Sequence, residues 1–398
     1  MASHIAFFNF PAYGHLNPTL GVVEELVRRG HRVTCTVTDH FAPAVAAAGA
    51  EPVPYESVFG AYYTSPFTQE ALSGEGLRTL REATSLVEQV TPFYEQHRPD
   101  VVLHDFMAWG ARFFATPRDI PVIRLFPTYA ANEQFSIQAK FPVAELTDPK
   151  MMEMIGELEQ ILPTVGLGDL SPMEFFTQPE RNAIVFLPRA FHYDGDTFDD
   201  RFTFAGPCLG DRSAFQGTWR PVDDTPTVLV SLGTAATGWP EFFVTAVQGL
   251  GGTDRRIVLV TGDHVDPATL GAVPANVEVH RSVPQLDVLA HATLFVTHGG
   301  MNSTMESLYH GVPMVVIPQM NEQRANALRV AELGLGVHLD RAEVTAESLA
   351  KAVDTVAGDQ QTTARVADFS AAMRAVDGPA VAADTVERVL AQQRGAAA

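Results

Sequence analysis

The sequence is poor in cysteine. Of its 398 residues only two are cysteines, Cys35 and Cys208, so at most one disulfide could form. Both lie in otherwise apolar segments, where a reduced thiol behaves as a small hydrophobic side chain. This scarcity favours a reducing cytosol and predicts a cytoplasmic protein.

Positive charge is also scarce. Lysine and arginine number 27 against 47 aspartates and glutamates, so the formal net charge is -20. Such a charge repels the phosphate backbone of nucleic acids and the anionic surface of a membrane. We therefore expect neither nucleic acid nor membrane as a partner.

Long hydrophobic runs and a secretory signal are missing as well. No stretch approaches the roughly 20 apolar residues that a membrane-spanning helix needs, because even the run 311–318 is bracketed by His310, Gln319 and Asn321. Residues 1–4 lack the basic region of a secretory signal. The sequence predicts a soluble protein without an export signal.

The length indicates two domains. At roughly 100–200 residues per domain, 398 residues are too many for one ordinary core. Hydrophobic residues make up 46% and charged residues 19%, which is close to the average of soluble globular proteins. A disordered or fibrous chain is therefore excluded.

The first 40 residues have the pattern of a strand, a helix and a second strand. Residues 4–8 and 33–37 are short apolar runs typical of buried strands. Between them, Asn17 and Pro18 suit the N-cap and the first position of a helix that ends at Gly30. Such a βαβ unit implies a parallel sheet covered on both faces.

Apolar runs of the same kind recur along the chain. They lie at 101–104, 122–126, 184–187, 227–231, 257–261, 277–280, 294–297 and 314–317. We predict an α/β fold of two doubly wound, Rossmann-like parallel-sheet domains, which cover residues 1–206 and 227–379. Residues 207–226 lack periodicity and are interpreted as a linker, residues 135–177 as a helical insertion, and residues 380–398 as a C-terminal helix.

Domains of this kind have a predictable binding region. Ligands bind outside the carboxyl ends of the strands of a doubly wound sheet. Two such domains facing each other form a deep central cleft.

One strand end has the pattern of an anion-binding site. A strand that ends at Thr297 leads through Gly299 and Gly300 into a helix of about residues 302–310. The N-terminal N–H groups and the positive dipole end of a helix attract a phosphate. In an acidic chain such groups suit a nucleotide diphosphate better than a polyanion.

Neutral side chains add to this anion site. Asn302 and Ser303 lie in the expected first turn, and His298 enters from the strand end as a further donor. The alternative is structural, since Ser303 and Glu306 match a capping box and Gly300 can simply shape the turn.

Seven short blocks stand in order along nearly the whole chain. They are Phe10-Pro-Ala-Tyr-Gly-His-Leu-Asn-Pro18, Leu103-His-Asp105, Ser231-Leu-Gly-Thr234, Val283-Pro-Gln285, His298-Gly-Gly-Met-Asn-Ser303 with Glu306, Gly311-Val-Pro313 and Glu322-Gln323. Together they resemble the family 1 UDP-sugar glycosyltransferases, in particular the bacterial macrolide glycosyltransferase branch and its broad-specificity relatives in Bacillus and Streptomyces.

This resemblance implies the GT-B fold, with an N-terminal acceptor domain, a C-terminal nucleotide-sugar domain and a last helix that crosses back to the first domain. It also implies an inverting, metal-independent transfer in which the UDP-sugar is a co-substrate, with no cofactor and no metal site. The diphosphate would contact His298, Asn302, Ser303 and Thr234, the ribose hydroxyls Glu306, and the sugar hydroxyls Glu322 and Gln323. Val283 and Gln285 would flank the base, and Gly14, Asn17, Ser231, Gly233, Ser282 and Gly300 complete the expected donor site.

Two positions depart from the family pattern. Many relatives have tryptophan where this chain has Ser282, and its indole stacks on the uracil; plant members also have tryptophan where this chain has Met301. The choice of base is thus less firmly implied than sugar transfer, and we expect UDP rather than TDP.

His15 and Asp105 are the expected catalytic pair. His15 follows the first expected strand, and Asp105 follows the strand 101–104. A neutral imidazole, with a pKa of about 6.5, can take the proton from an acceptor hydroxyl, and a carboxylate can fix its tautomer. In the resembling family the matching pair acts in this way. The alternative makes His15 a loop histidine and Asp105 a helix N-cap, while strand alternation makes His104 structural.

Aromatic residues and methionine gather in the loops expected near His15. Core packing is the default explanation for any one of them, but a cluster on loops suits a bulky hydrophobic acceptor such as a macrolide, a flavonoid or another phenol. The expected acceptor residues are Phe59, Phe67, Met107, Trp109, Thr128, Tyr129 and Phe135.

The sequence thus predicts an inverting glycosyltransferase that moves glucose from UDP-glucose to a hydroxyl of such a molecule. Alternatives are a TDP-sugar donor, a nucleotide-sugar hydrolase or epimerase, and a non-catalytic nucleotide-sugar sensor or auxiliary protein. A dinucleotide oxidoreductase fails because residues 8–18 contain only Gly14 where three glycines are needed. The acceptor, its role in antibiotic resistance or natural-product synthesis, and the choice between monomer and homodimer stay open.

Overall fold

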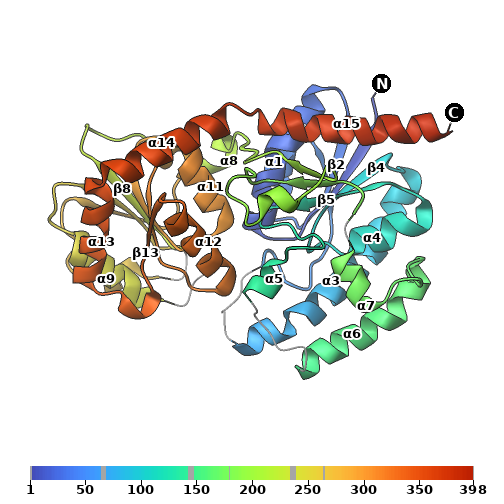
Figure 1. The fold of residues 1–398 in the computed structure, drawn as a ribbon, viewed down its shortest axis with the longest axis horizontal. Helices are drawn as coiled ribbons and strands as arrows, with labels where there is room; N and C mark the ends of the chain where they lie inside the picture. The colour runs from blue at the N-terminus through green and yellow to red at the C-terminus, as the bar shows by residue number, and fades with distance from the viewer. Residues whose placement is uncertain are drawn as a thin grey trace. The chain divides into compact units, whose positions relative to one another are not determined.

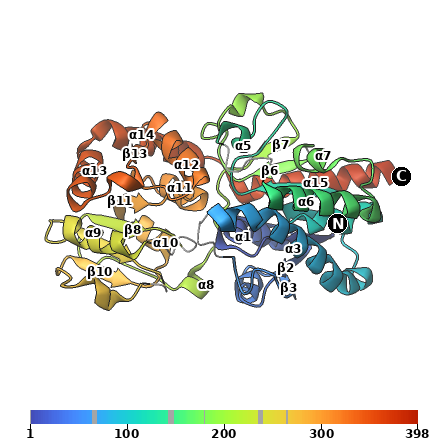
Figure 2. The ribbon, with the colours of Figure 1, turned by 90° about the horizontal axis from the view of Figure 1, so that it is seen from below.

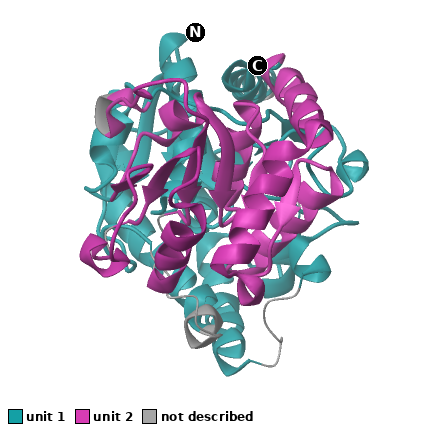
Figure 3. Cartoon of the chain, turned by 90° about the vertical axis from the view of Figure 1, so that its left-hand side faces the viewer, with its two compact units in different colours: residues 1–64, 68–211, 376–398 teal, residues 65–67, 212–375 magenta. Residues whose placement is uncertain are grey.

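The computed structural model describes residues 2–63, 69–141, 148–178, 180–233, 239–262 and 265–397. The chain divides into two compact units (Figure 3). The described residues within 2–63, 69–211 and 376–397 form the first unit, and those within 212–375 form the second. The first boundary falls inside the predicted linker 207–226, between Asp211 and Arg212.

The first unit is built on a parallel sheet. Among its described residues, seven strands follow the order β3-β2-β1-β4-β5-β6-β7, and every neighbouring pair is parallel (Figure 1). The strands are β1 (His4–Phe8), β2 (Arg32–Val37), β3 (Glu51–Pro54), β4 (Val101–Asp105), β5 (Val122–Phe126), β6 (Ala183–Val185) and β7 (Phe202–Phe204).

Helices cover this sheet, as the continuous apolar strands require. They are α1 (Tyr13–Arg28), α2 (Ala42–Ala47), α3 (Gln69–Gln96), α4 (Gly110–Ala115), α5 (Ile137–Lys140), α6 (Pro149–Ile161), α7 (Pro172–Thr177) and α15 (Gly378–Ala397). The predicted insertion 135–177 contains α5, α6 and α7, and α6 packs along α3 (Figures 1 and 2). Gly76 permits this approach, because a Cβ there would lie 2.6 Å from Sδ of Met154.

The predicted start of the first helix was wrong. Helix α1 begins at Tyr13, and Pro18 lies inside it. Ala12 is the N-cap in an extended conformation, and its carbonyl accepts the N–H groups of His15 and Leu16 at 3.0 and 2.9 Å. Pro18 is the sixth residue of α1 and cannot donate the intrahelical hydrogen bond to the carbonyl four residues earlier. The helix tolerates this loss, so the Asn17-Pro18 pair did not mark the helix start.

The second unit repeats the architecture. Among its described residues, six parallel strands follow the order β10-β9-β8-β11-β12-β13. The strands are β8 (Thr227–Ser231), β9 (Arg256–Val260), β10 (Val277–His280), β11 (Ala292–Thr297), β12 (Met314–Val316) and β13 (Gly336–His338). The prediction of two doubly wound parallel-sheet domains is confirmed.

Seven α-helices accompany this second sheet within the described part of the chain. They are α8 (Ser213–Gln216), α9 (Pro240–Leu250), α10 (Gln285–Leu289), α11 (Met301–Tyr309), α12 (Asn321–Glu332), α13 (Ala346–Gly358) and α14 (Gln360–Arg374). One core forms where apolar residues of α9 and α13 pack on β8, β9 and β11, and α11 packs against α12 and α14 (Figure 2). In both units, no described helix is both long and apolar enough to span a membrane.

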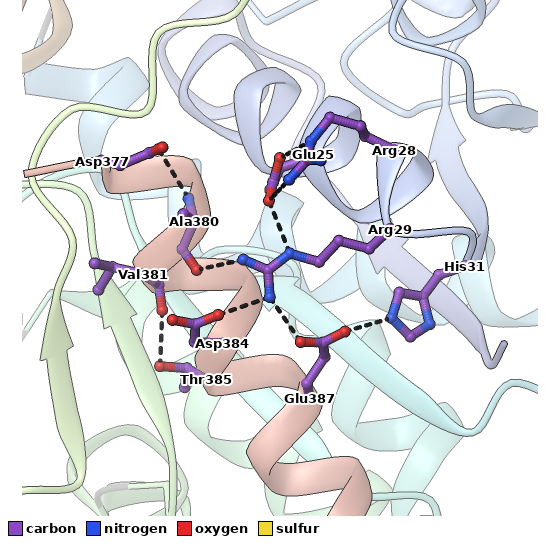
Figure 4. Close-up of polar contacts among 10 residues, drawn as sticks. All are labelled: Glu25, Arg28, Arg29, His31, Asp377, Ala380, Val381, Asp384, Thr385 and Glu387. Carbon is purple, nitrogen blue, oxygen red and sulfur yellow. Dashed lines mark hydrogen bonds and ion pairs between the residues drawn. The ribbon is translucent and has the colours of Figure 1, made fainter. Parts of the chain in front are cut away.

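The C-terminal helix α15 packs along α1 within the first unit, and Arg29 is the centre of their polar contact (Figure 4). Its guanidinium donates from Nη1 to Asp384 and Glu387, both at 2.6 Å, and from Nε to Glu25 at 2.7 Å. His31 Nε2 lies 3.1 Å from the other oxygen of Glu387. Hydrogen bonds from the arginines lower the pKa of Glu25 to about 2, so this carboxylate stays ionised at neutral pH.

Replacing Arg29 by alanine should loosen α15. The Arg29 side chain is only 18% exposed and pairs with three carboxylates, and leaving such charges unpaired should cost about 2 kcal/mol. We expect the melting temperature to fall by roughly 4–8 °C, as that energy implies for a unit of this size. Arg28→Ala is the matched control, because Arg28 is 71% exposed and pairs with Glu25 on its own helix. Equal melting curves for the two variants would show that Arg29 does not hold α15.

Candidate active site

Both sheets reverse their strand order once, and the predicted site residues lie at these reversals. In the first sheet β1 lies between β2 and β4, and in the second β8 lies between β9 and β11. Connections leave the sheet in opposite directions at such a point, so the strand ends there are open to a ligand. His15 follows β1 and Asp105 is the last residue of β4, while Gly233 and His298 follow β8 and β11.

His15 and Asp105 form a hydrogen bond, although 90 residues separate them in the sequence. His15 is in the first turn of α1, and its Nδ1 lies 2.8 Å from Oδ2 of Asp105. The carboxylate is 1% exposed and the imidazole 23% exposed. Oδ1 of Asp105 accepts the backbone N–H of Met107 at 2.8 Å, so both oxygens are held. A buried carboxylate that orients a partly exposed imidazole is the arrangement of a general base.

The alternatives for these residues do not fit the structure. Asp105 is not a helix N-cap, because α4 begins at Gly110 with Trp109 as its N-cap. His104 is buried, and its Nδ1 donates to the Asp105 carbonyl at 3.0 Å. Burial and Arg124 lower the pKa of His104 to about 3, so this ring is neutral and serves the structure.

Aromatic rings surround His15. Phe106 stacks on the imidazole with a centroid distance of 5.7 Å, and Phe10 lies at 5.0 Å. Phe59 and Tyr63 extend this group, because both lie within 5.5 Å of the Phe10 ring. Phe59, a predicted acceptor residue, therefore belongs to an aromatic wall that also contains His15.

Other predicted acceptor residues lie elsewhere in the first unit. Trp109 is buried against Phe176 at 4.9 Å, in a core cluster of α3, α4, α6 and α7. Tyr129 and Phe135 are buried around His192, at 5.3 and 5.2 Å.

The structure says less about the three remaining residues that were predicted to contact the acceptor. Met107 is half-buried two residues after Asp105, and Thr128 is half-buried after β5. Phe67 lies outside the described residues.

In the second unit, glycines make room for the His298 ring. A Cβ at Gly233 would lie 2.5 Å from Cε1 of the imidazole, and one at Gly300 would lie 2.5 Å from Nε2. Gly233 also has a φ of +77°, and its N–H donates to Oγ of Ser231 at 3.2 Å. Burial lowers the pKa of His298 to about 4. The ring is therefore neutral at pH 7 and acts as a hydrogen-bonding group without charge.

Helix α11 starts where the sequence predicts a phosphate site. Its N-cap is Gly300, which makes no side-chain cap, so Ser303 and Glu306 do not form the capping box offered as the alternative. Asn302 and Ser303 are half-buried in the first turn. The first-turn N–H groups of any helix point outward along its axis and attract anions.

Glu306 on α11 connects its own helix with the segment of Arg212 and with the start of α10. Its carboxylate is almost completely buried, with Oε1 accepting from Nη1 of Arg212 and Oε2 accepting from Nε2 of Gln285, both at 2.7 Å. The Gln285 amide also donates to Oγ of Ser303 at 3.2 Å. The structure therefore brings Gln285 together with Ser303 and Glu306, which belong to a different block of the sequence.

The other predicted donor residues are spread over both units. Ser282 is exposed and Val283 half-buried between β10 and α10, while Glu322 and Gln323 begin α12. Oε1 of Gln323 accepts the N–H of Gln319 at 2.9 Å.

Three donor predictions stand apart from the second unit's site. Gly14 and Asn17 lie on α1 beside His15, in the first unit. Thr234 lies outside the described residues. Among the residues that are described, no group of three or more His, Cys, Asp or Glu side chains could hold a metal ion.

Sequence reasoning missed two residues at these sites. Arg212 lies in the stretch interpreted as a linker, yet it is buried and ion-paired. Phe10 packs beside His15. It lies two residues after the end of β1 and in the same sequence block as His15, and this was the signal that could have identified it.

Known proteins resemble this chain over almost its full length. The family model described as UDP-glucoronosyl and UDP-glucosyl transferase matches residues 218–375. The chain is 40% identical to NDP-glycosyltransferase YjiC of Bacillus subtilis (strain 168), over 96% of each chain. It is 39% identical to demethyllactenocin mycarosyltransferase of Streptomyces fradiae, over 98% of this chain and 87% of that one. The solved structure of CalG4, the calicheamicin glycosyltransferase, is similar with a TM-score of 0.86 and 35% identity over 98% of both chains. The chain therefore belongs to the family 1 glycosyltransferases, the UDP-glucuronosyl and UDP-glucosyl transferase family, and has their GT-B fold.

Proposed function

We propose that this glycosyltransferase moves glucose from UDP-glucose to a hydroxyl of a hydrophobic small molecule, such as a macrolide, a flavonoid or another phenol, with inversion and without a metal. The observation that carries the proposal is the 2.8 Å contact between His15 Nδ1 and Asp105 Oδ2 at the reversal of the first sheet. It supplies an oriented base for the acceptor hydroxyl.

The proton path follows from the tautomer. With Nδ1–H directed at Asp105, the lone pair of the neutral imidazole is on Nε2. Nε2 takes the hydroxyl proton while the acceptor oxygen forms its bond to the anomeric carbon. The bond from that carbon to the diphosphate oxygen breaks with its electron pair on UDP, and Asp105 stabilises the imidazolium. A single displacement of this kind inverts the anomeric configuration.

The aromatic wall supports an apolar acceptor. Phe10, Phe59 and Phe106 form a continuous aromatic surface that includes the His15 ring. Large planar rings bind hydrophobic molecules without demanding one polar pattern. A relative named demethyllactenocin mycarosyltransferase is consistent with a natural-product acceptor for this chain.

The second unit supports a nucleotide donor whose diphosphate is stabilised by neutral groups. The start of α11 offers N–H groups and a positive dipole end to the departing diphosphate. His298 is neutral and lies next to Gly300 at that helix end. These groups need no metal to bind the diphosphate.

A ribose nucleotide suits the pocket residues better than a deoxyribose one. The Glu306 carboxylate is fixed by two hydrogen bonds of 2.7 Å, and its two oxygens can accept from two neighbouring hydroxyls. Only a ribose has both hydroxyls, which favours UDP over TDP.

His15→Ala should lower kcat about 10²- to 10⁴-fold, because that is the typical contribution of a positioned base. The dissociation constant for UDP should not change. Asp105→Asn should also lower kcat, since the asparagine amide favours the wrong tautomer. His97→Ala, at an exposed position directly after α3, is the matched control. Hexose transfer measured by mass spectrometry at a wild-type rate in His15→Ala would contradict the assignment.

Gly300→Ala should weaken UDP binding while leaving the fold intact. The added Cβ would lie 2.5 Å from Nε2 of His298 and must displace that ring. Isothermal titration should show a loss of about tenfold or more, the equivalent of one lost hydrogen bond to a charged group. Gly358→Ala is the control, because nothing lies within 4 Å of its added Cβ. An unchanged affinity in Gly300→Ala would argue against a diphosphate at His298.

With UDP-α-glucose and a phenolic acceptor, the product should be the β-glucoside, seen as a large anomeric coupling in the proton spectrum. EDTA should leave the rate unchanged, and TDP-glucose should react more slowly. An α-product would contradict direct displacement. Consumption of UDP-glucose without an acceptor would favour a hydrolase, and tight binding without turnover would favour a sensor.

A further inference from the structure

Arg212 makes a buried ion pair with the carboxylate assigned to the ribose. It is the first residue of the second unit's main segment and is 5% exposed. Its Nη1 lies 2.7 Å from Oε1 of Glu306, which is 2% exposed. The positive charge that pairs with Glu306 thus comes from a stretch of the sequence whose composition is typical of a linker.

The carboxylate of Glu306 is fixed at both oxygens. Arg212 holds Oε1 and the Gln285 amide holds Oε2, each at 2.7 Å. A carboxylate oxygen can accept about two hydrogen bonds, so each oxygen keeps capacity for one more. Rotation of the carboxylate about the Cγ–Cδ bond would break both hydrogen bonds. The lone pairs that remain available therefore point in a fixed direction.

Stability alone does not explain an arginine at this position. A buried ion pair is on average no more stable than an apolar pair of similar volume. The Nε atom of Arg212 is also buried and has no hydrogen-bond partner among the described residues, which is an additional cost. In a chain with a net charge of -20, the effect that an apolar residue could not supply is a positively charged hydrogen-bond donor beside the buried carboxylate of Glu306.

The segment that carries Arg212 is itself held in place. The N–H of Trp219 donates to Oδ2 of Asp287 at 3.0 Å. Asp287 lies on α10, as does Gln285. One short helix therefore anchors both the segment of Arg212 and the second oxygen of Glu306, so the ion pair is positioned before any ligand arrives.

We propose that Arg212 is a positioning residue for ribose recognition. Its charged hydrogen bond holds the Glu306 carboxylate oriented to accept the 2′- and 3′-hydroxyls, and the preference of this enzyme for ribonucleotide over deoxyribonucleotide donors depends on it. The proposal rests on the proposed function, because it assumes that Glu306 faces the ribose of a nucleotide donor.

The test compares UDP with 2′-deoxy-UDP by isothermal titration of the full-length protein. Wild type should bind UDP about 10- to 100-fold more tightly, because a hydrogen bond to a charged group contributes on that scale. Arg212→Met should reduce this ratio to about threefold or less, as should Glu306→Gln, and the double variant should reduce it no further. Arg220→Met is the matched control, since Arg220 lies in the same segment with a 69% exposed side chain and should keep the wild-type ratio.

A merely structural Arg212 would give a different result. In that case Arg212→Met would weaken the binding of UDP and of 2′-deoxy-UDP by the same factor. An unchanged ratio of the two affinities in Arg212→Met therefore overturns the proposal. If that variant does not fold, Arg212→Gln provides the same test, because its amide can still donate to Glu306 but carries no charge. A wild-type ratio near one, or an unchanged ratio in Glu306→Gln, would overturn the ribose assignment as well. If Glu306→Gln loses the preference for UDP over 2′-deoxy-UDP and Arg212→Met keeps it, the role of Arg212 alone is overturned.

Discussion

The reversal of strand order in each parallel sheet is the constraint on which the site residues depend. On either side of β1 the chain connects through opposite faces of the sheet, so the loops after β1 and β4 diverge. His15, in the first turn of α1, and Asp105, the last residue of β4, meet here at 2.8 Å despite their distance in sequence. In the second sheet the same reversal places Gly233 after β8 beside His298 after β11.

Neutral groups dominate the expected diphosphate site, and this agrees with the acidic character of the chain. His298 has a pKa of about 4 and carries no charge at pH 7. The start of α11 contributes backbone dipoles, which are part of the fold and need no counterion. The one buried anion assigned to donor recognition, Glu306, is offset by Arg212 within hydrogen-bond distance. Charge is thus balanced locally, although the chain as a whole carries -20.

Much of the fold could be predicted from apolar runs, because strands buried on both faces leave a strong signal. β5, β8 and β10 begin and end at the predicted residues. The 28-residue helix α3 was not predicted, since Gly74, Gly76 and Pro92 weaken its local helical signal and its stability comes from packing against α4 and α6.

The site shows the same division between local signal and tertiary contact. His15, Asp105, His298 and Glu306 stand in short motifs next to strand ends, where their chemistry can be inferred. Arg212 could not be found in this way, because its partner lies 94 residues further along the chain. Trp109 was expected at the acceptor site, but its sequence position beside Met107 does not reveal that it packs against Phe176 of the α6–α7 region.

We propose that Asp105 holds His15 as a base with its lone pair on Nε2. Nitrogen-15 NMR of histidine-labelled protein reports the tautomer of this ring, with the His15 signals assigned by their loss in His15→Gln. We expect the neutral His15 ring to be protonated on Nδ1, and Asp105→Asn to shift it toward the Nε2–H form. A wild-type ring protonated on Nε2, or a tautomer unaffected by Asp105→Asn, would contradict it.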